Sequence, residues 1–232
     1  MLNNTFNPLP DQARWFSLVG IHWKVFAAAA FLVAIPVFIE APLVRNWPWL
    51  SVALTGFWVN LSYFLYQKPQ TKIWGDLLCG FSWSWLAGAI YWGWWRWVPA
   101  VHLPIESIGL PIVLWLCWKG KGQIGSLFYL GSLVGTAVTD LYFYLVDLVG
   151  YWQQLMVIEP ALAAPILQAA VLQVRSPWGT TWAVILVSLL LSLGIICLNR
   201  KKNHWYAFSG AILTTIVVDA LFLVLANINQ TL

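Results

Sequence analysis

Charged side chains are scarce in this sequence, because Asp, Glu, Lys and Arg make up only 9% of its 232 residues. A soluble domain carries about 25% charged residues, so a soluble fold of this size is excluded. The hydrophobic residues, 61% of the chain, recur in apolar runs of about 18–22 residues, the length that a bilayer-spanning helix requires. The sequence therefore predicts an all-α, polytopic transmembrane helix bundle in a lipid bilayer.

Several chemical signatures are also missing. The three cysteines, Cys79, Cys117 and Cys197, are scattered within apolar runs and resemble buried thiols rather than a disulfide or metal set. No CxxC, HExxH, Walker or Rossmann pattern occurs, which argues against nucleotide hydrolysis and gives no metal site. A soluble basic face is absent, so nucleic acid is not an expected partner.

The chain divides into a short tail and one domain. Residues 1–20 lack the features of a signal peptide and are expected to form a polar tail, with an interfacial turn at 14–16. Residues 21–232 are expected to form a single transmembrane domain of seven to eight membrane segments. The expected segments cover residues 21–42, 48–66, 76–97, 103–118, 127–148, 150–175, 178–198 and 205–226.

The distribution of Lys and Arg bears on how many segments cross. If all eight segments cross, seven basic residues fall on the N-terminal side and five on the other. If residues 150–175 lie flat or re-enter, the count becomes nine against three, which fits the positive-inside rule better. Pro160 and Pro165 also favour a broken segment there. We therefore favour seven spans with a cytoplasmic N-terminus, while segment 103–118 is the alternative re-entrant one.

The acidic residues lie almost entirely in or beside apolar segments. Glu40, Glu106 and Glu159 each follow an isoleucine and precede a proline by one to five residues, which predicts three helix ends at one membrane rim. Apolar surroundings favour the neutral form of a carboxyl group, so these residues are candidate acids. The other residues expected at this rim are Arg96, His102, Trp92, Trp95 and Trp97.

A structural explanation competes with the catalytic one. The rim carboxylates would pair with Arg45, Arg96 and Arg175 at the interface, and the tryptophans would form an aromatic belt at the headgroups. Asp140 and Asp219 fall within predicted spans, where a carboxylate is costly and suggests function. They are interpreted either as a proton relay or as helix-pairing groups bonded to hydroxyls on neighbouring turns.

Two family resemblances can be named. Gly75–Leu78, Gly80–Gly88, Tyr91–Trp94 and Leu103–Glu106 resemble an uncharacterised family of multi-pass membrane proteins from cyanobacteria, which implies a photosynthetic (thylakoid or plasma) membrane. Tyr91-Trp92-Gly93 followed by Pro104-Ile105-Glu106 is similar to the small membrane-embedded lycopene cyclase domains, although Ser107 stands where a second glutamate is expected. That resemblance implies an acid role for Glu106 alone.

Three functions remain open at this stage. The leading one is a non-catalytic assembly, stability or accessory factor for membrane complexes. The alternatives are a membrane enzyme of isoprenoid, carotenoid or lipid metabolism, and a small proton-coupled transporter. No cofactor is implied by a motif, and pigment or lipid binding stays open because His22, His102 and His204 could each ligate a pigment metal. An interfacial hydrogen bond is the more ordinary role for such a histidine.

Overall fold

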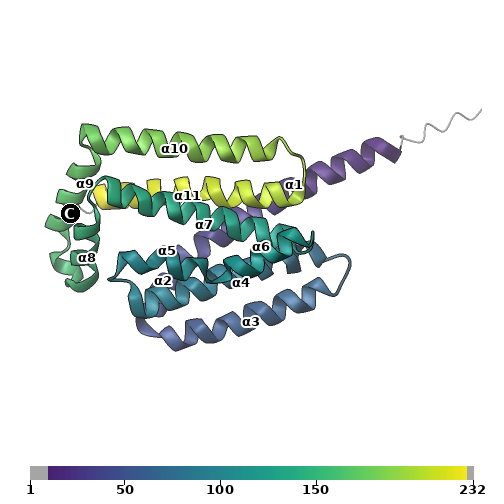
Figure 1. The fold of residues 1–232 in the computed structure, drawn as a ribbon, viewed down its shortest axis with the longest axis horizontal. Coiled ribbons are helices and arrows are strands. Elements are labelled where there is room, and N and C mark those ends of the chain that lie inside the picture. The colour runs from purple at the N-terminus through teal and green to yellow at the C-terminus, as the bar shows by residue number, and fades with distance from the viewer. Residues whose placement is uncertain (1–9, 229–232) are drawn as a thin grey trace, which may run out of the picture.

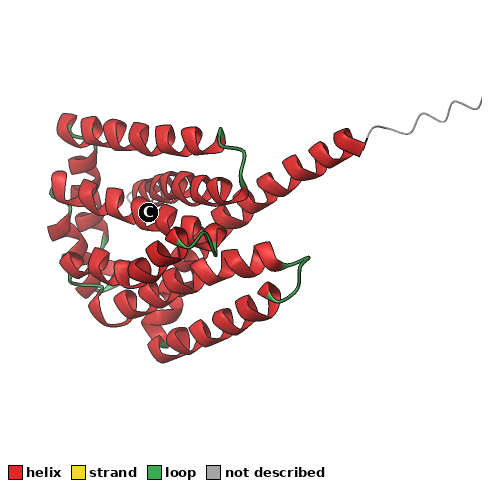
Figure 2. Ribbon diagram, turned by 45° about the vertical axis from the view of Figure 1, so that its right-hand side comes forward, coloured by secondary structure: helices red, strands yellow, loops and turns green. Residues whose placement is uncertain are grey.

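Long helices run side by side in a bundle, and a layer of short helices crosses one of its ends (Figure 1). The computed structural model describes residues 10–228, and helices joined by short loops account for this part of the chain (Figure 2). In chain order the helices are α1 (Pro10–Ile35), η1 (Pro36–Glu40), α2 (Ala41–Asn46), α3 (Pro48–Tyr66), α4 (Lys72–Ile90), η2 (Tyr91–Trp95), η3 (Pro99–Val101), α5 (His102–Glu106), η4 (Ser107–Gly109), α6 (Leu110–Trp118), α7 (Gln123–Leu145), α8 (Val149–Val157), η5 (Pro160–Leu162), α9 (Ala164–Val174), α10 (Pro177–Leu198) and α11 (Asn203–Ile228).

Five segments of the described chain are long and apolar enough to cross a membrane. They are Gly20–Asn46, Pro99–Trp118, Gln123–Leu145, Pro177–Leu198 and Asn203–Asn227. The helices α3 and α4 have 19 residues each and pack against each other in the same bundle, but they do not belong to this set of five. The all-α, membrane-spanning class is thus confirmed, whereas the predicted count of seven to eight segments is not.

The predicted segment 150–175 forms the crossing layer. It contains the 9-residue α8 and the 11-residue α9, and the backbone between them becomes extended at Ile158. Neither helix has the length of about 20 residues that a span requires. Both lie across the end of the bundle rather than along it (Figure 1). We call α8, η5 and α9 the cap.

The start of the first long helix differs from the expectation for the N-terminal tail. Helix α1 begins at Pro10 and runs without interruption to Ile35. Half of the predicted polar tail, including the interfacial turn at 14–16, is therefore helical. Residues 1–9 of that tail lie outside the described part of the chain.

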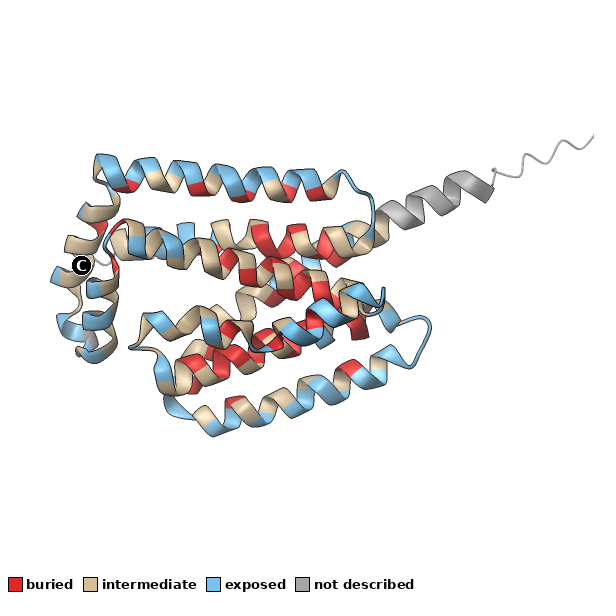
Figure 3. Ribbon diagram, in the orientation of Figure 1, coloured by how far each residue is buried: buried red, intermediate tan, exposed pale blue. Residues whose placement is uncertain are grey.

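The core lies where α1, α4, α7 and α11 cross, and buried residues concentrate there (Figure 3). Small residues allow the closest approach of these helices. A Cβ on Gly131 would lie 2.7 Å from the Phe208 carbonyl oxygen, and one on Gly135 would lie 2.2 Å from Thr215 Oγ1. The small-xxx-small spacing of these glycines thus marks the contact of α7 with α11, as such spacing is expected to do.

A second close crossing joins α4 to the start of α7. A Cβ on Gly80 would lie 2.0 Å from the Gly125 carbonyl oxygen. One turn earlier, the Asp76 carboxylate accepts hydrogen bonds from the backbone N–H groups of Ile124 (3.0 Å) and Gly125 (3.2 Å). These N–H groups have no partner within their own helix, so Asp76 caps α7 from a neighbouring helix. Its role is structural.

The two ends of the bundle carry different loops (Figure 1). One end holds the start of α1 and the α3–α4, α6–α7 and α10–α11 turns. The other end holds the α2–α3 and α4–α5 connections and the cap. Of the twelve Lys and Arg residues in the sequence, only Arg45, Arg96 and Arg175 belong to the capped end.

Candidate functional site

The helical path of the chain is broken twice at the capped end. Both η1 and η2 are single π-helical turns, which follow α1 and α4 directly. A π turn inserts one extra residue and changes which side chains face inward, and such turns are frequent at functional sites. Pro36 opens η1, where its ring excludes the regular α-helical hydrogen bond. Glu40, the last residue of η1, points into the bundle.

Glu40 is completely buried, with 0% of its surface exposed. Its Oε1 atom accepts a hydrogen bond of 2.9 Å from the Ser51 hydroxyl of α3. Its Oε2 atom has no hydrogen-bond partner among the described residues and lies against Gly88, where a Cβ would approach it to 2.7 Å. Trp85 fixes the same corner by donating its Nε1–H to the Ser51 carbonyl at 2.9 Å.

His102 lies between two carboxylates at the start of α5. Its Nδ1 atom is 2.9 Å from Asp140 Oδ1 of α7, and its Nε2 atom is 3.9 Å from Glu106 Oε1, one helical turn further along. Glu106 is buried, while the side chains of His102 and Asp140 are about one-fifth exposed. Only the contact with Asp140 has hydrogen-bond length, because 3.9 Å exceeds the usual range.

These residues form one electrostatic group. The carboxyl group of Glu106 interacts with those of Glu40 and Asp140 as well as with the His102 ring. We call Glu40, His102, Glu106 and Asp140 the acid–histidine cluster. The cluster therefore combines three carboxyl groups with one imidazole, and these are the side chains that most often donate and accept protons in catalysis.

Aromatic residues fix the geometry of the cluster. The Tyr91 ring stacks on the His102 ring, with 4.0 Å between the ring centroids. The Tyr129 hydroxyl donates to the Glu106 carbonyl oxygen at 2.5 Å and accepts from the Gly109 N–H at 3.2 Å. This second contact secures the chain where it leaves α5 for α6. Tyr91, Tyr129 and Ser51 support the site, and sequence reasoning assigned a role to none of them.

The cluster lies at one depth beneath the capped end. Asp140 is five residues before the end of α7, and Glu40 is six residues before the end of α2. At a rise of 1.5 Å per residue, both lie about 8–9 Å inside the bundle. Trp152 of α8 covers this end, because its ring contacts the Trp92 and Phe143 rings at 5.5 and 6.0 Å. Its Nε1–H also donates to the Arg96 carbonyl at 2.9 Å.

The structure separates several residues that the sequence analysis placed together. Glu159 is exposed in the cap and does not reach the cluster. Arg96 donates to the Trp92 carbonyl of its own turn at 3.3 Å and lies over the Trp97 ring at 5.4 Å. Arg175 bonds Asn227 at 2.5 Å. Neither arginine therefore serves as the counter-ion of a rim carboxylate. Two of the three arginines that were expected to pair with these carboxylates thus bond elsewhere.

Asp219 makes its hydrogen bond outside the acid–histidine cluster, although its carboxyl group also interacts with that of Asp140. Its Oδ2 atom accepts a hydrogen bond of 2.8 Å from Thr139 Oγ1. Thr139 and Asp140 are consecutive in α7 and point about 100° apart, so Asp219 and His102 lie on different sides of that helix. Asp219 is exposed within a predicted span, where an Asp costs about 2.5–3.5 kcal/mol near the bilayer centre. The two mid-span aspartates therefore have separate partners.

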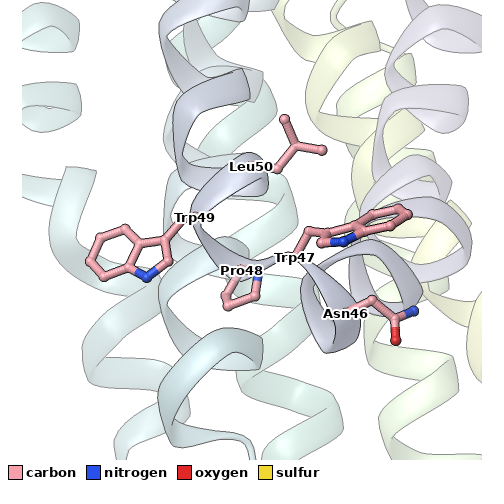
Figure 4. A pocket seen from close by; sticks show the side chains of 5 residues that line it. All are labelled: Asn46, Trp47, Pro48, Trp49 and Leu50. Atoms are coloured by element: carbon pink, nitrogen blue, oxygen red, sulfur yellow. The ribbon is translucent and has the colours of Figure 1, made fainter.

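Two shallow hollows open outward near the capped end. One, of about 400 Å³, follows the α2–α3 turn and is lined by Asn46, Trp47, Pro48, Trp49 and Leu50 (Figure 4). The other, of about 370 Å³, lies on the outer face of α5. It is lined by the mainly apolar residues Ile90, Trp95, Val101, Pro104, Ile105 and Ile108. No member of the acid–histidine cluster lines this hollow, although Ile105 precedes Glu106 in the sequence.

The other histidines do not join this site. His22 Nδ1 lies 2.5 Å from Asn203 Oδ1, and its ring stacks on Tyr206 near the opposite end of the bundle. His204 packs beside Trp205 there, with 5.5 Å between the ring centroids. Within residues 10–228, no three His, Cys, Asp or Glu side chains are placed to hold a metal ion.

The fold and the site together define a polytopic helical membrane protein with a buried acid–histidine cluster at one end of its bundle. A family model described as "Protein of unknown function (DUF3120)" matches residues 29–227, so the chain belongs to that family. The matched region runs from the middle of α1 to the end of α11 and includes the whole cluster. No curated protein and no solved structure matches the chain.

Proposed function

We propose that this protein is a membrane enzyme that performs acid–base chemistry on an apolar, membrane-dissolved substrate of the isoprenoid or lipid class. The observation that carries the proposal is His102, held between Asp140 and Glu106 and stacked on Tyr91. An imidazole oriented by one carboxylate and close to a second is an arrangement that stores and delivers a proton. Glu106 is the proposed acid, and His102 with Asp140 would restore its proton.

The burial of these groups argues against a purely scaffolding role. Ionisable residues within membrane segments are costly and mark functional sites by default. A scaffold could balance rim carboxylates with arginines, yet Arg96 and Arg175 bond elsewhere. Glu40 has an unpartnered carboxyl oxygen in a fully buried position, an arrangement that only weakens a static protein.

The depth of the cluster argues against a transporter. A proton path would need titratable groups at successive depths across the bilayer. Within the cluster, Glu40 and Asp140 lie at the same depth beneath the capped end, and His102 begins α5 at that end; Asp219 is the one deeper carboxylate near them. This arrangement suits a reaction on a molecule held at one membrane level. The hollow of about 370 Å³ on the outer face of α5 is a place where the apolar part of such a molecule could lie.

The aromatic surroundings suit a cationic transition state. Tyr91 and Trp92 lie beside the cluster, and aromatic faces stabilise a developing cation. Protonation of an alkene by a buried carboxylic acid produces such a cation. The resemblance to cyanobacterial membrane proteins directs the search for the substrate to the pigments and lipids of a photosynthetic membrane. Assembly of membrane complexes stays a second candidate, supported by the separate surface around Asp219.

A deletion strain of the native host tests the proposal. The strain would be complemented with the wild-type chain, with Glu106→Gln or with Glu159→Gln, and its membrane lipids and pigments would be profiled. We expect the deletion and Glu106→Gln to accumulate the same apolar precursor, while Glu159→Gln restores the normal profile because Glu159 is exposed outside the cluster. An unchanged profile in the deletion strain, or full rescue by Glu106→Gln, would contradict the enzymatic role.

We further propose that α3 and α4 cross the membrane with the five apolar segments, so that the bundle has seven spans and a cytoplasmic N-terminus. This orientation puts nine of the twelve basic residues on the cytoplasmic side. The cluster then faces the opposite leaflet. Labelling of single cysteines at Lys121 and Gln153 with an impermeant reagent tests it, since only Gln153 should react from outside. Reaction at Lys121 from outside would reverse the orientation.

A further inference from the structure

Part of the second half of α11, residues 219–225, is exposed around the whole helix, and we call it the bare half of α11. Residues 219–225 are seven consecutive exposed positions. A helix completes a turn in 3.6 residues, so this run exposes almost two full turns. The first half of the same helix is packed, and Tyr206, Ala207, Ala211 and Ile212 are buried there. Towards the capped end the helix is thus covered only in part, and its contacts there include those of Asp219 with Thr139 and of Phe222 with Phe38.

The bare half of α11 carries a carboxylate. Within the described chain, the Asp219 carboxylate accepts a hydrogen bond from the Thr139 hydroxyl and interacts with the Asp140 carboxylate, and neither group supplies positive charge. Asp219 lies nine residues before Ile228, the last residue of the helix, and so about 14 Å along the helix from its end. An apolar surface facing lipid needs no carboxylate, and a lone one at this depth is destabilising.

The exposed surface continues onto the first helix. The Phe222 ring stacks on the Phe38 ring of η1, with 6.2 Å between the centroids. Phe38 and the neighbouring Ile39 are both about half exposed, as is Phe222. Asp219 and these aromatic rings therefore form one lateral face, with a single acidic group inside a wide apolar border.

We propose that this face docks a transmembrane helix of another protein that carries a Lys, Arg or His side chain at the depth of Asp219. The pairing supplies the positive charge that this chain does not provide there, and the apolar border covers the bare half of α11. Thr139 orients the carboxylate by bonding one of its oxygens, which leaves the other for the partner. In a membrane, association of this kind depends on close packing and on interhelical polar bonds.

A second copy of the chain fits the face less well. A two-fold contact through it would bring the two Asp219 carboxylates together, and their like charges would repel. Nine of the twelve basic residues lie towards the opposite end of the bundle and cannot reach this depth in a parallel partner. At the capped end, Arg175 is already bonded to Asn227.

A photo-crosslinking amino acid at Leu223 tests the proposal in native membranes. We expect one heterologous membrane protein to be captured, with the crosslinked peptide in an apolar span that contains a basic residue. The same amino acid at Leu189, which is exposed on α10, is the matched control and should not capture that protein. Asp219→Asn should lower the crosslinking yield about tenfold, the effect of losing one polar bond, and Asp219→Lys should abolish it.

Three results would overturn the proposal. The first two are capture of a second copy of this chain and capture of lipid alone. The third is capture of a partner that does not depend on charge, shown by a span without a basic residue or by a crosslinking yield that Asp219→Asn leaves unchanged. The thermal stability of the purified Asp219→Asn protein should match that of the wild type, which separates lost docking from misfolding. Membrane lipid profiles separate this proposal from the enzymatic one, because Asp219→Asn should leave the Glu106-dependent profile intact.

Discussion

The two contacts of His102 should differ in strength, and a double-mutant cycle measures that difference. The perturbations are His102→Gln, Asp140→Asn and Glu106→Gln, alone and in pairs. The distance to Asp140 Oδ1 is 2.9 Å and that to Glu106 Oε1 is 3.9 Å. Coulomb energy falls as the inverse of distance. If both carboxylates are ionised, the attraction of His102 to Asp140 therefore exceeds its attraction to Glu106 by only about a third. The hydrogen bond must supply the rest of the difference.

The expected coupling energies follow from that bond. A hydrogen bond to a charged group contributes about 1.5–3 kcal/mol, and only the 2.9 Å contact makes one. We therefore expect about 2 kcal/mol of coupling between His102 and Asp140. Between His102 and Glu106 we expect about 1 kcal/mol or less, since their separation of 3.9 Å is too long for a hydrogen bond.

Reversible unfolding of the purified protein in detergent gives these energies. Asp140→Asn alone should lower the free energy of unfolding by about 1–2 kcal/mol, because the amide keeps a neutral hydrogen bond to the imidazole. The melting temperature should then fall by a few degrees, about 2–4 °C per kcal/mol in a chain of this size. Equal coupling in the two cycles, or a stronger coupling to Glu106, would refute the assigned geometry.

Two further changes test helix packing, one at the α4–α7 crossing and one beneath the cap. Gly125→Ala should destabilise the protein by about 1–3 kcal/mol by overpacking, since the new Cβ would lie 2.1 Å from the Asp76 carbonyl oxygen. Gly56→Ala, where no atom lies within 4 Å, is the control and should be neutral or stabilising in a melting assay. Trp152→Leu removes the cap's ring contacts and should expose the α7–α8 junction to faster hydrogen exchange; unchanged protection there would exclude a sealing role for Trp152.

Local patterns predicted the helices well, because a bilayer span leaves a long and simple signal. The bounds of α3, Pro48–Tyr66, coincide with a predicted segment, and α10 starts one residue before its prediction. The glycines at 131 and 135 marked a real helix contact. The segment with Pro160 and Pro165 was expected to be broken, and it forms the two short helices of the cap. Each of these signals is carried by residues close in sequence.

The composition of the cluster could not be predicted in the same way. Asp140 and His102 are 38 residues apart, and nothing in either local pattern identifies the other as its partner. A shared Ile-Glu pattern grouped Glu159 with Glu40 and Glu106, yet the same local sequence lies in the exposed cap in one case and in the buried core in the others. Arginine partners were inferred from depth alone, but depth does not fix the direction in which a side chain points.

Glu40 shows why helix periodicity alone would not place this carboxylate in the core. Leu32, Glu40 and Val44 are all buried, at spacings of eight and four residues. Each step of four residues advances about 40° beyond a full turn of an α-helix, so three such steps would carry Val44 about 120° away from Leu32. The π turn of η1 absorbs this drift by placing one extra residue in the turn. Phe38 and Ile39 then face outward, and the carboxylate faces the core. A purely α-helical continuation would turn the apolar Ile39 inward instead of Glu40. The π turn of η1 therefore both buries Glu40 and leaves Phe38 exposed beside α11.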